Sequence, residues 1–244
     1  MSNRCVIVIP ARMGATRFPG KPLVNLHGKP MVQWVYEASV ASGVADEVVI
    51  AAPDQEIIDA VAKFGARGVL TRHDHQTGTD RLAEVAELIP AFVYVNVQGD
   101  EPLIQPASIA ACVQPILNDT SIQMSSVYSI CPDEELDQAH IVKVVTDKDG
   151  FALYFSRHPI PFARNPRVIP VKKHVGLYAF SRQALLEFKN WPMGDLETAE
   201  SLEQLRFMEN GVRIFMVQAD GTELAVDTPE QAKEVEALLI KRHG

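Results

Sequence analysis

The chain has 244 residues, of which 47% are hydrophobic and 22% charged, and its formal net charge is −8. This composition, without a linker or low-complexity stretch, predicts one domain over residues 1–244, and the acidic balance disfavours nucleic acid as a partner because its backbone needs a basic face. No apolar run approaches the ~20 residues of a membrane span, and residues 1–4 lack the pattern of a secretory signal, so we expect a cytoplasmic protein without membrane contact.

The first predicted strand and the loop behind it organise the N-terminal part. Residues 5–9, CVIVI, form a short apolar run typical of a buried parallel strand, at whose carboxyl end open α/β sheets bind ligands. The following loop combines glycines and prolines with the cations Arg12, Arg17 and Lys21. Its spacing fits neither a P-loop nor a dinucleotide fingerprint. We interpret it as a polyphosphate site; an ordinary solvated basic turn is the alternative.

Two strand–helix units continue the chain. Residues 30–42 carry apolar side chains at helical spacing and end at Gly43, which can serve as a C-cap. A strand over residues 48–52 follows, and then a helix that begins at the N-cap Asp54 and ends at Gly65. Successive strand–helix units predict a doubly wound α/β sheet with parallel strands.

A polar stretch separates a short strand over residues 68–71 from a helix over residues 81–89. Its segment 77–79, Thr-Gly-Thr, offers hydroxyls and free backbone N–H groups suited to a base edge or a phosphate, although alone it would be a helix cap. We expect His73 and His75 to be exposed loop residues, because no fourth metal ligand lies near them in the sequence.

A strand over residues 92–97 ends at Gln98, Gly99, Asp100 and Glu101. Carboxylates at the end of a central strand suit Mg²⁺, which also takes phosphate oxygens, so we predict Asp100 as a metal ligand with Glu101 secondary. An acidic turn is the alternative. If this strand is parallel and adjacent to the first, the carboxylates and the cations of the first loop converge on one crevice.

The C-terminal half adds strands and helices and one further aspartate. Asp227 precedes Thr228-Pro229-Glu230-Gln231, a capping box with proline at the first helical position, which fixes it at a strand-to-helix junction. The predicted elements are a helix over 106–117, strands over 122–130 and 140–146, a connecting loop over 168–171, a strand over 174–180, and helices over 181–189 and 199–208. Residues 152–157 follow Gly150 and end in an arginine before Pro159 and Pro161, which enforce extended backbone.

The loop after the first strand resembles the P-A-R-x-x-S/A-T-R-x-P-x-K signature of sugar-nucleotide pyrophosphorylases and cytidylyltransferases, here Pro10-Ala11-Arg12, Thr16-Arg17, Pro19 and Lys21. Within that group the chain is most similar to the 3-deoxy-manno-octulosonate (Kdo) cytidylyltransferases, or CMP-Kdo synthetases. The similar blocks are HQTGTDRLAEV (75–85), NVQGDEP (96–102), VKVV (142–145), GFALYFSR (150–157), HVGLYAF (174–180), LEQLR (202–206) and VDTPE (226–230). Longer family members carry extra residues before His174, so the contacts of residues 162–171 are not predicted.

The resemblance implies a Rossmann-like fold with a mixed, mostly parallel central sheet, helices on both faces and a smaller lobe for sugar binding and dimerisation. It implies a homodimeric cytidylyltransferase that activates Kdo with CTP, giving CMP-Kdo and diphosphate for lipopolysaccharide biosynthesis. Two alternatives stay open. The chain could activate another sugar acid, such as 8-amino-Kdo or a sialic acid, or it could be a nucleotide-sensing module without catalysis.

The resemblance also implies roles for individual residues. The expected catalytic residues are Lys21, Arg12, Arg17 and Asp100, and the expected ligands of Mg²⁺ are Asp100 and Asp227. The expected nucleotide-binding residues are Pro10, Ala11, Arg12, Lys21, Thr77, Gly78, Arg81, Gln98, Gly99 and Asp100. The expected sugar-binding residues are Gln98, Arg157, His174, Tyr178, Glu203 and Gln204. The forked guanidinium of Arg157 suits the carboxylate of the sugar acid, and a surface arginine is the alternative.

Overall fold

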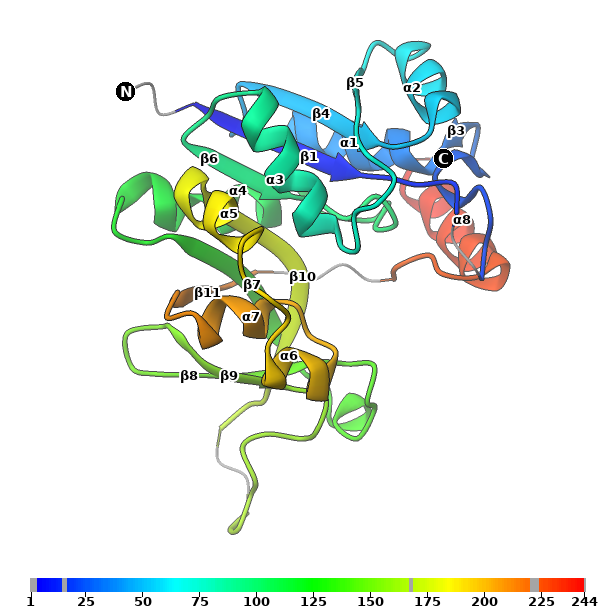
Figure 1. Cartoon of the computed structure of the whole chain (residues 1–244). Helices are drawn as coiled ribbons and strands as arrows, with labels where there is room; N and C mark the ends of the chain where they lie inside the picture. Colours follow the sequence, from blue (N-terminus) through cyan, green and yellow to red (C-terminus); the bar gives the residue numbers. More distant parts are fainter. Residues whose placement is uncertain (1–3, 15–16, 167–168, 220–223, 244) are drawn as a thin grey trace.

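The computed structural model describes residues 4–14, 17–166, 169–219 and 224–243. One sheet runs through this part of the chain, with the strand order β11-β7-β10-β6-β1-β4-β5, with β8 attached to β10 and β9 attached to β8 (Figure 1). Its strands are β1 (Cys5–Pro10), β4 (Glu47–Ala52), β5 (Arg67–Leu70), β6 (Val93–Asn96), β7 (Met124–Ile130), β8 (Lys143–Thr146), β9 (Ala152–Ser156), β10 (Lys172–Ser181) and β11 (Ile214–Gln218). A separate two-stranded sheet pairs β2 (Asn25–Leu26) with β3 (Lys29–Pro30).

Helices cover both faces of the large sheet. They are α1 (Met31–Ala41), α2 (Gln55–Ala62), α3 (Gly78–Leu88), α4 (Pro106–Asn118), α5 (Arg182–Phe188), α6 (Asp195–Glu200), α7 (Gln204–Glu209) and α8 (Pro229–His243), with short 3₁₀ turns η1 (Lys21–Leu23) and η2 (Asp133–Glu135). Apolar residues of α1, α2 and α4 pack on the face that includes Ile7 and Ile9. Those of α3, α5 and α7 pack on the face that includes Val6 and Val8.

The central strand β1 is buried on both faces, as its CVIVI sequence predicts. It pairs in parallel with β4 on one side and with β6 on the other, so that Val8 lies between Val49 and Asn96. Burying each such Val or Ile side chain stabilises the fold by about 1.5–3 kcal/mol. The carboxyl ends of β1 and β6 therefore meet at one edge of a rigid sheet.

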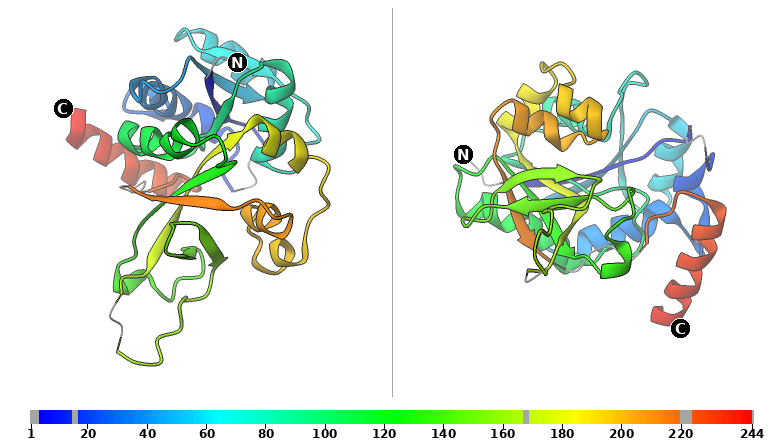
Figure 2. Two further views of the ribbon diagram at one scale, coloured as in Figure 1. Left: turned by 90° about the vertical axis from the view of Figure 1, so that its left-hand side faces the viewer. Right: turned by 90° about the horizontal axis from the view of Figure 1, so that it is seen from below.

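The antiparallel strand β10 joins this parallel core to a smaller lobe. It pairs with β6 through its second half and with β8 through Lys172 and Lys173. The lobe of β8, β9 and the following loop extends away from the upper part of the sheet (Figure 1). Figure 2 shows α8 at the side of the molecule with its C-terminal end pointing outward. Residues of α8 pack with Leu26, Trp34 and Leu103 in a separate apolar cluster.

Several predicted boundaries were wrong, each for a local reason. The helix expected over 199–208 is two helices, α6 and α7, because Ser201 adopts a left-handed conformation with φ 51° between them. The helix expected from residue 81 begins at Gly78, since Thr77 and Asp80 form a capping box. Strand β11 was not predicted.

The other expected elements are present, within a few residues of their predicted ends. Of the loop expected over 168–171, residue 168 lies outside the described residues. No helix in the described part of the chain is both long and apolar enough to cross a membrane.

Candidate active site

A cleft of about 370 Å³ opens at the carboxyl ends of β1 and β6. Its walls are the loop after β1, the start of α3, the loop after β6 and the segment before α8. Arg17 and Asp227 line this cleft. So do all the residues predicted to bind the nucleotide, which are Pro10, Ala11, Arg12, Lys21, Thr77, Gly78, Arg81, Gln98, Gly99 and Asp100. The structure thus brings these residues together, and their individual roles stay predictions.

The loop after β1 is held in place by close backbone contacts. A Cβ atom on Gly99 would lie 2.7 Å from the carbonyl oxygen of Pro10, so only glycine lets the loops after β1 and β6 approach this closely. The backbone N–H of Met13 donates to Oδ2 of Asp54 at 2.8 Å. Asp54 is the N-cap residue of α2, as predicted, but its carboxylate makes no capping bond within the helix and is used to fix the loop instead.

Lys21 lies at the centre of the cleft's charged groups. Its Nζ is 2.6 Å from Oδ2 of Asp100, 3.0 Å from Oδ1 of Asp227 and 3.2 Å from the carbonyl oxygen of Val226. Burial alone would lower the pKa of Lys21, but the two carboxylates outweigh it and the net pKa is raised. The ammonium group therefore stays charged and holds two carboxylates against their mutual repulsion.

The position of Asp227 depends on its own backbone surroundings. The backbone N–H of Val226 donates to the carbonyl oxygen of Asp100 at 2.8 Å, which draws the segment before α8 to the loop after β6. Oε1 of Gln231 accepts from the N–H groups of Asp227 and Thr228 at 2.8 and 3.1 Å. The predicted capping box is confirmed, and it presents the Asp227 side chain to Lys21.

The two aspartates fit a divalent cation. Both direct a carboxylate oxygen at one cation, the Lys21 ammonium, so their oxygens already converge on a common point. Hard carboxylate oxygens that leave room for phosphate oxygens are the ligands that Mg²⁺ prefers in nucleotide sites. Glu101, the secondary candidate, is buried and faces Gly176 of β10, where a Cβ atom would lie 3.8 Å from its Oε1.

The start of α3 forms the opposite wall. Thr77 uses its hydroxyl within the capping box, where it accepts from the N–H of Asp80 at 3.1 Å. Arg81 is buried and donates to the Thr71 hydroxyl and to the carbonyl oxygen of Arg72. Burial lowers the pKa of Arg81, and Arg12 contributes in the same direction. The guanidinium groups of Arg12 and Arg81 thus lie close enough to influence each other across the cleft, and their combined positive charge favours an anionic ligand.

The site prediction missed the apolar cleft residues Phe18, Pro22 and Met31 and two polar ones that belong to the HQTGTDR block. His75 and Gln76 line the cleft beside Thr77. The expectation that His75 is exposed was wrong: only 6% of its side chain is accessible, and Nε2 pairs with Oε2 of Glu84. His73 is exposed as expected. The signal that could have found His75 is its spacing to Glu84, which comes nine residues later on the adjoining helix.

Four of the predicted sugar-side residues form a cluster next to this cleft. The rings of His174 and Tyr178 lie 5.3 Å apart, and the Tyr178 hydroxyl donates to Oε1 of Gln204 at 3.3 Å. Tyr178 pairs with Asn96 across β10 and β6, so the cluster adjoins the strand that leads to Asp100. Gln98, the fifth candidate, lies in the cleft itself, and its Nε2 donates to Oδ1 of Asn96 at 3.4 Å.

The cluster contains polar atoms that the protein leaves unsatisfied. Oε2 of Glu203 and Nε2 of Gln204 are buried and have no hydrogen-bond partner among the described residues. Burial raises the pKa of Glu203, and desolvation lowers the pKa of His174 to about 3. Buried polar atoms without partners are costly, so they indicate a place where a ligand supplies the missing partners.

Arg157 lies apart from that cluster. Its Nε donates to the carbonyl oxygen of Glu200 at 2.7 Å, and its terminal nitrogens donate to those of Ala139 and Ser201, each at 3.1 Å. Lys143 in turn donates to the carbonyl oxygen of Arg157 at 3.0 Å. These partners tie the arginine to the end of α6 and to the segment before β8, at the junction with the small lobe.

A mixed, mostly parallel sheet whose first loop gathers cations against two carboxylates defines a nucleotidyltransferase of the nucleotide-diphospho-sugar type. The family model described as Cytidylyltransferase matches residues 6–214. The 3-deoxy-manno-octulosonate cytidylyltransferase of Trichlorobacter lovleyi is 45% identical over 94% of this chain and 97% of its own length. The 3-deoxy-manno-octulosonate cytidylyltransferase of Syntrophotalea carbinolica is 47% identical over 95% of this chain and 97% of its own length.

A solved structure of CMP:2-keto-3-deoxy-manno-octonic acid synthetase complexed with CTP superimposes with a TM-score of 0.96 at 41% identity, covering 98% of this chain and 99% of that one. The chain belongs to the 3-deoxy-manno-octulosonate cytidylyltransferase family. The resemblance seen in the sequence motifs and the predicted fold class are both confirmed.

Proposed function

We propose that this protein transfers CMP from CTP to Kdo and releases diphosphate, which provides CMP-Kdo for lipopolysaccharide biosynthesis. The observation that carries the proposal is the group of Lys21, Asp100 and Asp227 at the centre of a cleft that Arg12 and Arg17 also line. These charged groups would also bind the triphosphate in a non-catalytic nucleotide sensor, so the turnover measurement below separates the two functions. The names of the relatives supply the identity of the base and of the sugar.

The reaction needs positioning and charge more than a protein nucleophile. The anomeric hydroxyl of the sugar attacks the α-phosphorus. The new oxygen–phosphorus bond forms as the bond to the diphosphate breaks, and the hydroxyl proton passes to solvent water. Lys21, Arg12 and Arg17 bind the triphosphate and neutralise the charge that develops on it. The wall of Thr77, Gly78 and Arg81 receives the base.

We further propose that Asp100 and Asp227 hold Mg²⁺ together with oxygens of the triphosphate. Bound there, Mg²⁺ stabilises negative charge on the phosphates and can lower the pKa of the attacking hydroxyl. The hydrogen bond from the backbone N–H of Val226 to the carbonyl oxygen of Asp100 holds together the two segments that carry these aspartates. Lys21 supplies a second positive charge within reach of the same oxygens.

The sugar is bound on the other side of β6. Oε2 of Glu203 and Nε2 of Gln204 take sugar hydroxyl groups, which supply the partners that these buried atoms lack in the described chain. Tyr178 and Gln98 contribute a hydroxyl and an amide, and His174 takes part as a neutral imidazole because desolvation holds its pKa at about 3. Arg157 binds the carboxylate of the sugar acid through N–H groups beyond those that it donates to the backbone.

We also propose a cytoplasmic homodimer. The small lobe exposes apolar side chains that a second copy would cover, with Phe162 88% and Leu153 58% accessible. The cysteines Cys5, Cys112 and Cys131 are buried thiols rather than disulfides, which suits a reducing compartment.

The test is diphosphate release from CTP and Mg²⁺ with a panel of sugar acids. We expect turnover to be highest with Kdo. Higher turnover with 8-amino-Kdo or with a sialic acid would show that this sugar acid, and not Kdo, is the substrate of the same cytidylyl transfer. Binding of CTP by calorimetry without turnover of any sugar acid would instead indicate a nucleotide-sensing module.

A further inference from the structure

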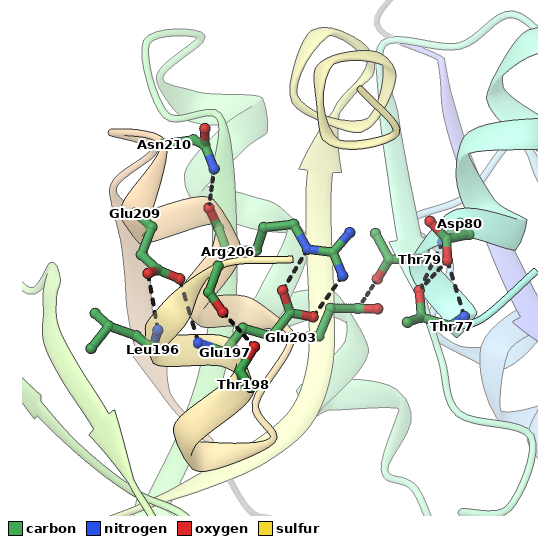
Figure 3. A network of polar contacts seen from close by, with 11 residues as sticks. Thr77, Thr79, Asp80, Leu196, Glu197, Thr198, Glu203, Arg206, Glu209 and Asn210 are labelled. Carbon is green, nitrogen blue, oxygen red and sulfur yellow. Dashed lines mark hydrogen bonds and ion pairs between the residues drawn. The ribbon is translucent and has the colours of Figure 1, made fainter. Parts of the chain in front are cut away.

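Thr79 makes a contact that the nucleotide cleft does not explain. It lies in the first turn of α3, between the cleft residues Gly78 and Arg81, yet it is buried with 1% accessibility and does not line the cleft. Its hydroxyl donates to Oε1 of Glu203, a residue 124 positions later at the start of α7 (Figure 3). The sequence pattern assigned this hydroxyl to a base edge or a phosphate, and the structure directs it to the sugar-side cluster instead.

The backbone beneath Glu203 is fixed independently of Thr79. Arg206 of α7 forms a buried two-bond ion pair with Glu197 of α6, through contacts of 2.5 and 2.6 Å (Figure 3). This pair holds the two short helices together, and α7 also packs through Leu205 and Phe207 on the sheet. The direction of the Glu203 carboxyl group is a separate matter, because a side chain can still turn on a fixed backbone.

One oxygen of that carboxyl group is anchored and the other is not. Oε1 accepts from Thr79, whereas Oε2 is buried with no hydrogen-bond partner among the described residues. The nearby Thr77 hydroxyl also acts on this carboxyl group, and like Thr79 it lowers the pKa of Glu203 against the effect of burial. An anchor on one oxygen sets the plane of the carboxyl group and therefore where the other oxygen points. The neighbouring Nε2 of Gln204, also buried and unsatisfied within the described chain, lies on the same cluster.

We propose that Thr79 is a positioning residue that orients Glu203 toward the sugar substrate and links the two half-sites through the first turn of α3. Successive residues of a helix point about 100° apart, so one turn presents Gly78 and Arg81 to the nucleotide and Thr79 to Glu203. The assignment rests on the proposed function, in which Glu203 binds a sugar hydroxyl. Thr79 itself touches neither substrate.

The experiment compares Thr79→Val, which keeps the shape and removes the hydroxyl, with Thr79→Ser, which keeps the hydroxyl. We expect Thr79→Val to raise the KM for Kdo roughly tenfold or more, as loss of a hydrogen bond to a charged or buried carboxyl group does. The KM for CTP should stay within about twofold of the wild-type value. Thr79→Ser should restore the KM for Kdo to near the wild-type value, which a role in packing alone would not predict.

Two further variants make the result specific. Thr198→Val removes a hydroxyl that donates to the carbonyl oxygen of Gly194 within α6, and it should leave both KM values unchanged. In a Glu203→Ala background, which removes the acceptor of the Thr79 hydroxyl, the additional effect of Thr79→Val on the KM for Kdo should largely disappear, because both changes act on the same contact. Thr79→Ala provides a second hydroxyl-free variant if the valine variant does not fold.

The proposal is overturned if Thr79→Val and Thr79→Ala leave the KM for Kdo unchanged, if Thr79→Ser is as impaired as Thr79→Val, or if the KM for CTP rises equally. A wild-type protein that binds CTP and turns over no sugar acid refutes the proposed function, and the positioning role with it. Normal wild-type turnover with an unaffected Thr79→Val variant refutes the positioning role alone.

Discussion

Nζ of Lys21 lies 2.6 Å from Oδ2 of Asp100, and the same ammonium group also pairs with Asp227. Lys21 is in the first loop of the chain and Asp227 lies 206 positions later, so the contact joins the beginning and the end of the fold. The side chain of Lys21 is only 15% accessible, which limits screening of the pair by solvent.

Lys21→Ala and Asp100→Asn should each lower kcat by a factor of about a hundred or more, because each removes charge directed at the transferring phosphorus. Circular dichroism and the thermal midpoint should show that both variants are folded. Lys29→Ala, which removes a cation that pairs with Glu37 outside the cleft, is the matched control and should keep normal turnover. A near-normal steady-state rate in a folded Lys21 or Asp100 variant would remove that residue from the mechanism.

Lys21→Met should bind Mn²⁺ more tightly than the wild-type protein when no nucleotide is present. The reason is that the ammonium group pairs with the carboxylate oxygens that a divalent cation needs, so removing it frees them. We expect a change of roughly tenfold in Kd, about 1.4 kcal/mol. Electron paramagnetic resonance of free Mn²⁺ measures the Kd without relying on activity. Equal or weaker binding by Lys21→Met would show that Asp100 and Asp227 are not the metal ligands.

Arg157→Lys should raise the KM for Kdo far more than the KM for CTP, because a lysine lacks the planar fork that meets a carboxylate in two hydrogen bonds. An effect of roughly tenfold to a hundredfold is expected from loss of a charge-assisted pair. The backbone contacts of Arg157 with Glu200 and Ser201 add a loss of stability, which the thermal midpoint reports separately. Arg164→Lys, at an exposed arginine of the following loop, is the control. A weaker affinity for CTP with an unchanged KM for Kdo would assign Arg157 to the triphosphate.

His174 should make the folded state sensitive to acid. Its pKa is about 3 in the folded protein against an ordinary value of 6.5, because the ring is desolvated between Phe155 and Tyr178. Between these two pH values the unfolded chain binds a proton that the folded chain does not, so stability falls as the pH drops below 6.5. The loss attributable to this group is at most about 1.4 kcal/mol per pH unit.

Urea unfolding at pH 7 and at pH 5 tests this sign. His174→Gln, which keeps a polar group for the Ser126 hydroxyl, should show a shallower loss of the free energy of unfolding than the wild-type protein. His140→Gln, at an exposed histidine, should leave the slope unchanged. The same slope in His174→Gln and in the wild-type protein would mean that this ring does not resist protonation.

Much of the fold is determined by short-range sequence features. Residues 5–9 predict a buried strand because every side chain is apolar, and β1 is buried in that way. The pattern at Thr228 and Gln231 predicts a capping box because the atoms that bond to each other lie within four residues. The strand–helix alternation at the N-terminus likewise predicts a parallel core, and the sheet order confirms it. Each of these depends on interactions between neighbours in the chain.

The site depended more on the tertiary structure. The sequence motifs identified Lys21, Asp100 and Asp227, but only the packing of α8 and the loop after β6 brings them within hydrogen-bond distance. The sequence pattern did not predict the partners of the Thr79 hydroxyl and the Asp54 carboxylate, because a local helix cap is an alternative that the pattern satisfies equally well. A distant partner decides among such alternatives, since a buried polar atom takes whichever partner the packed chain places beside it.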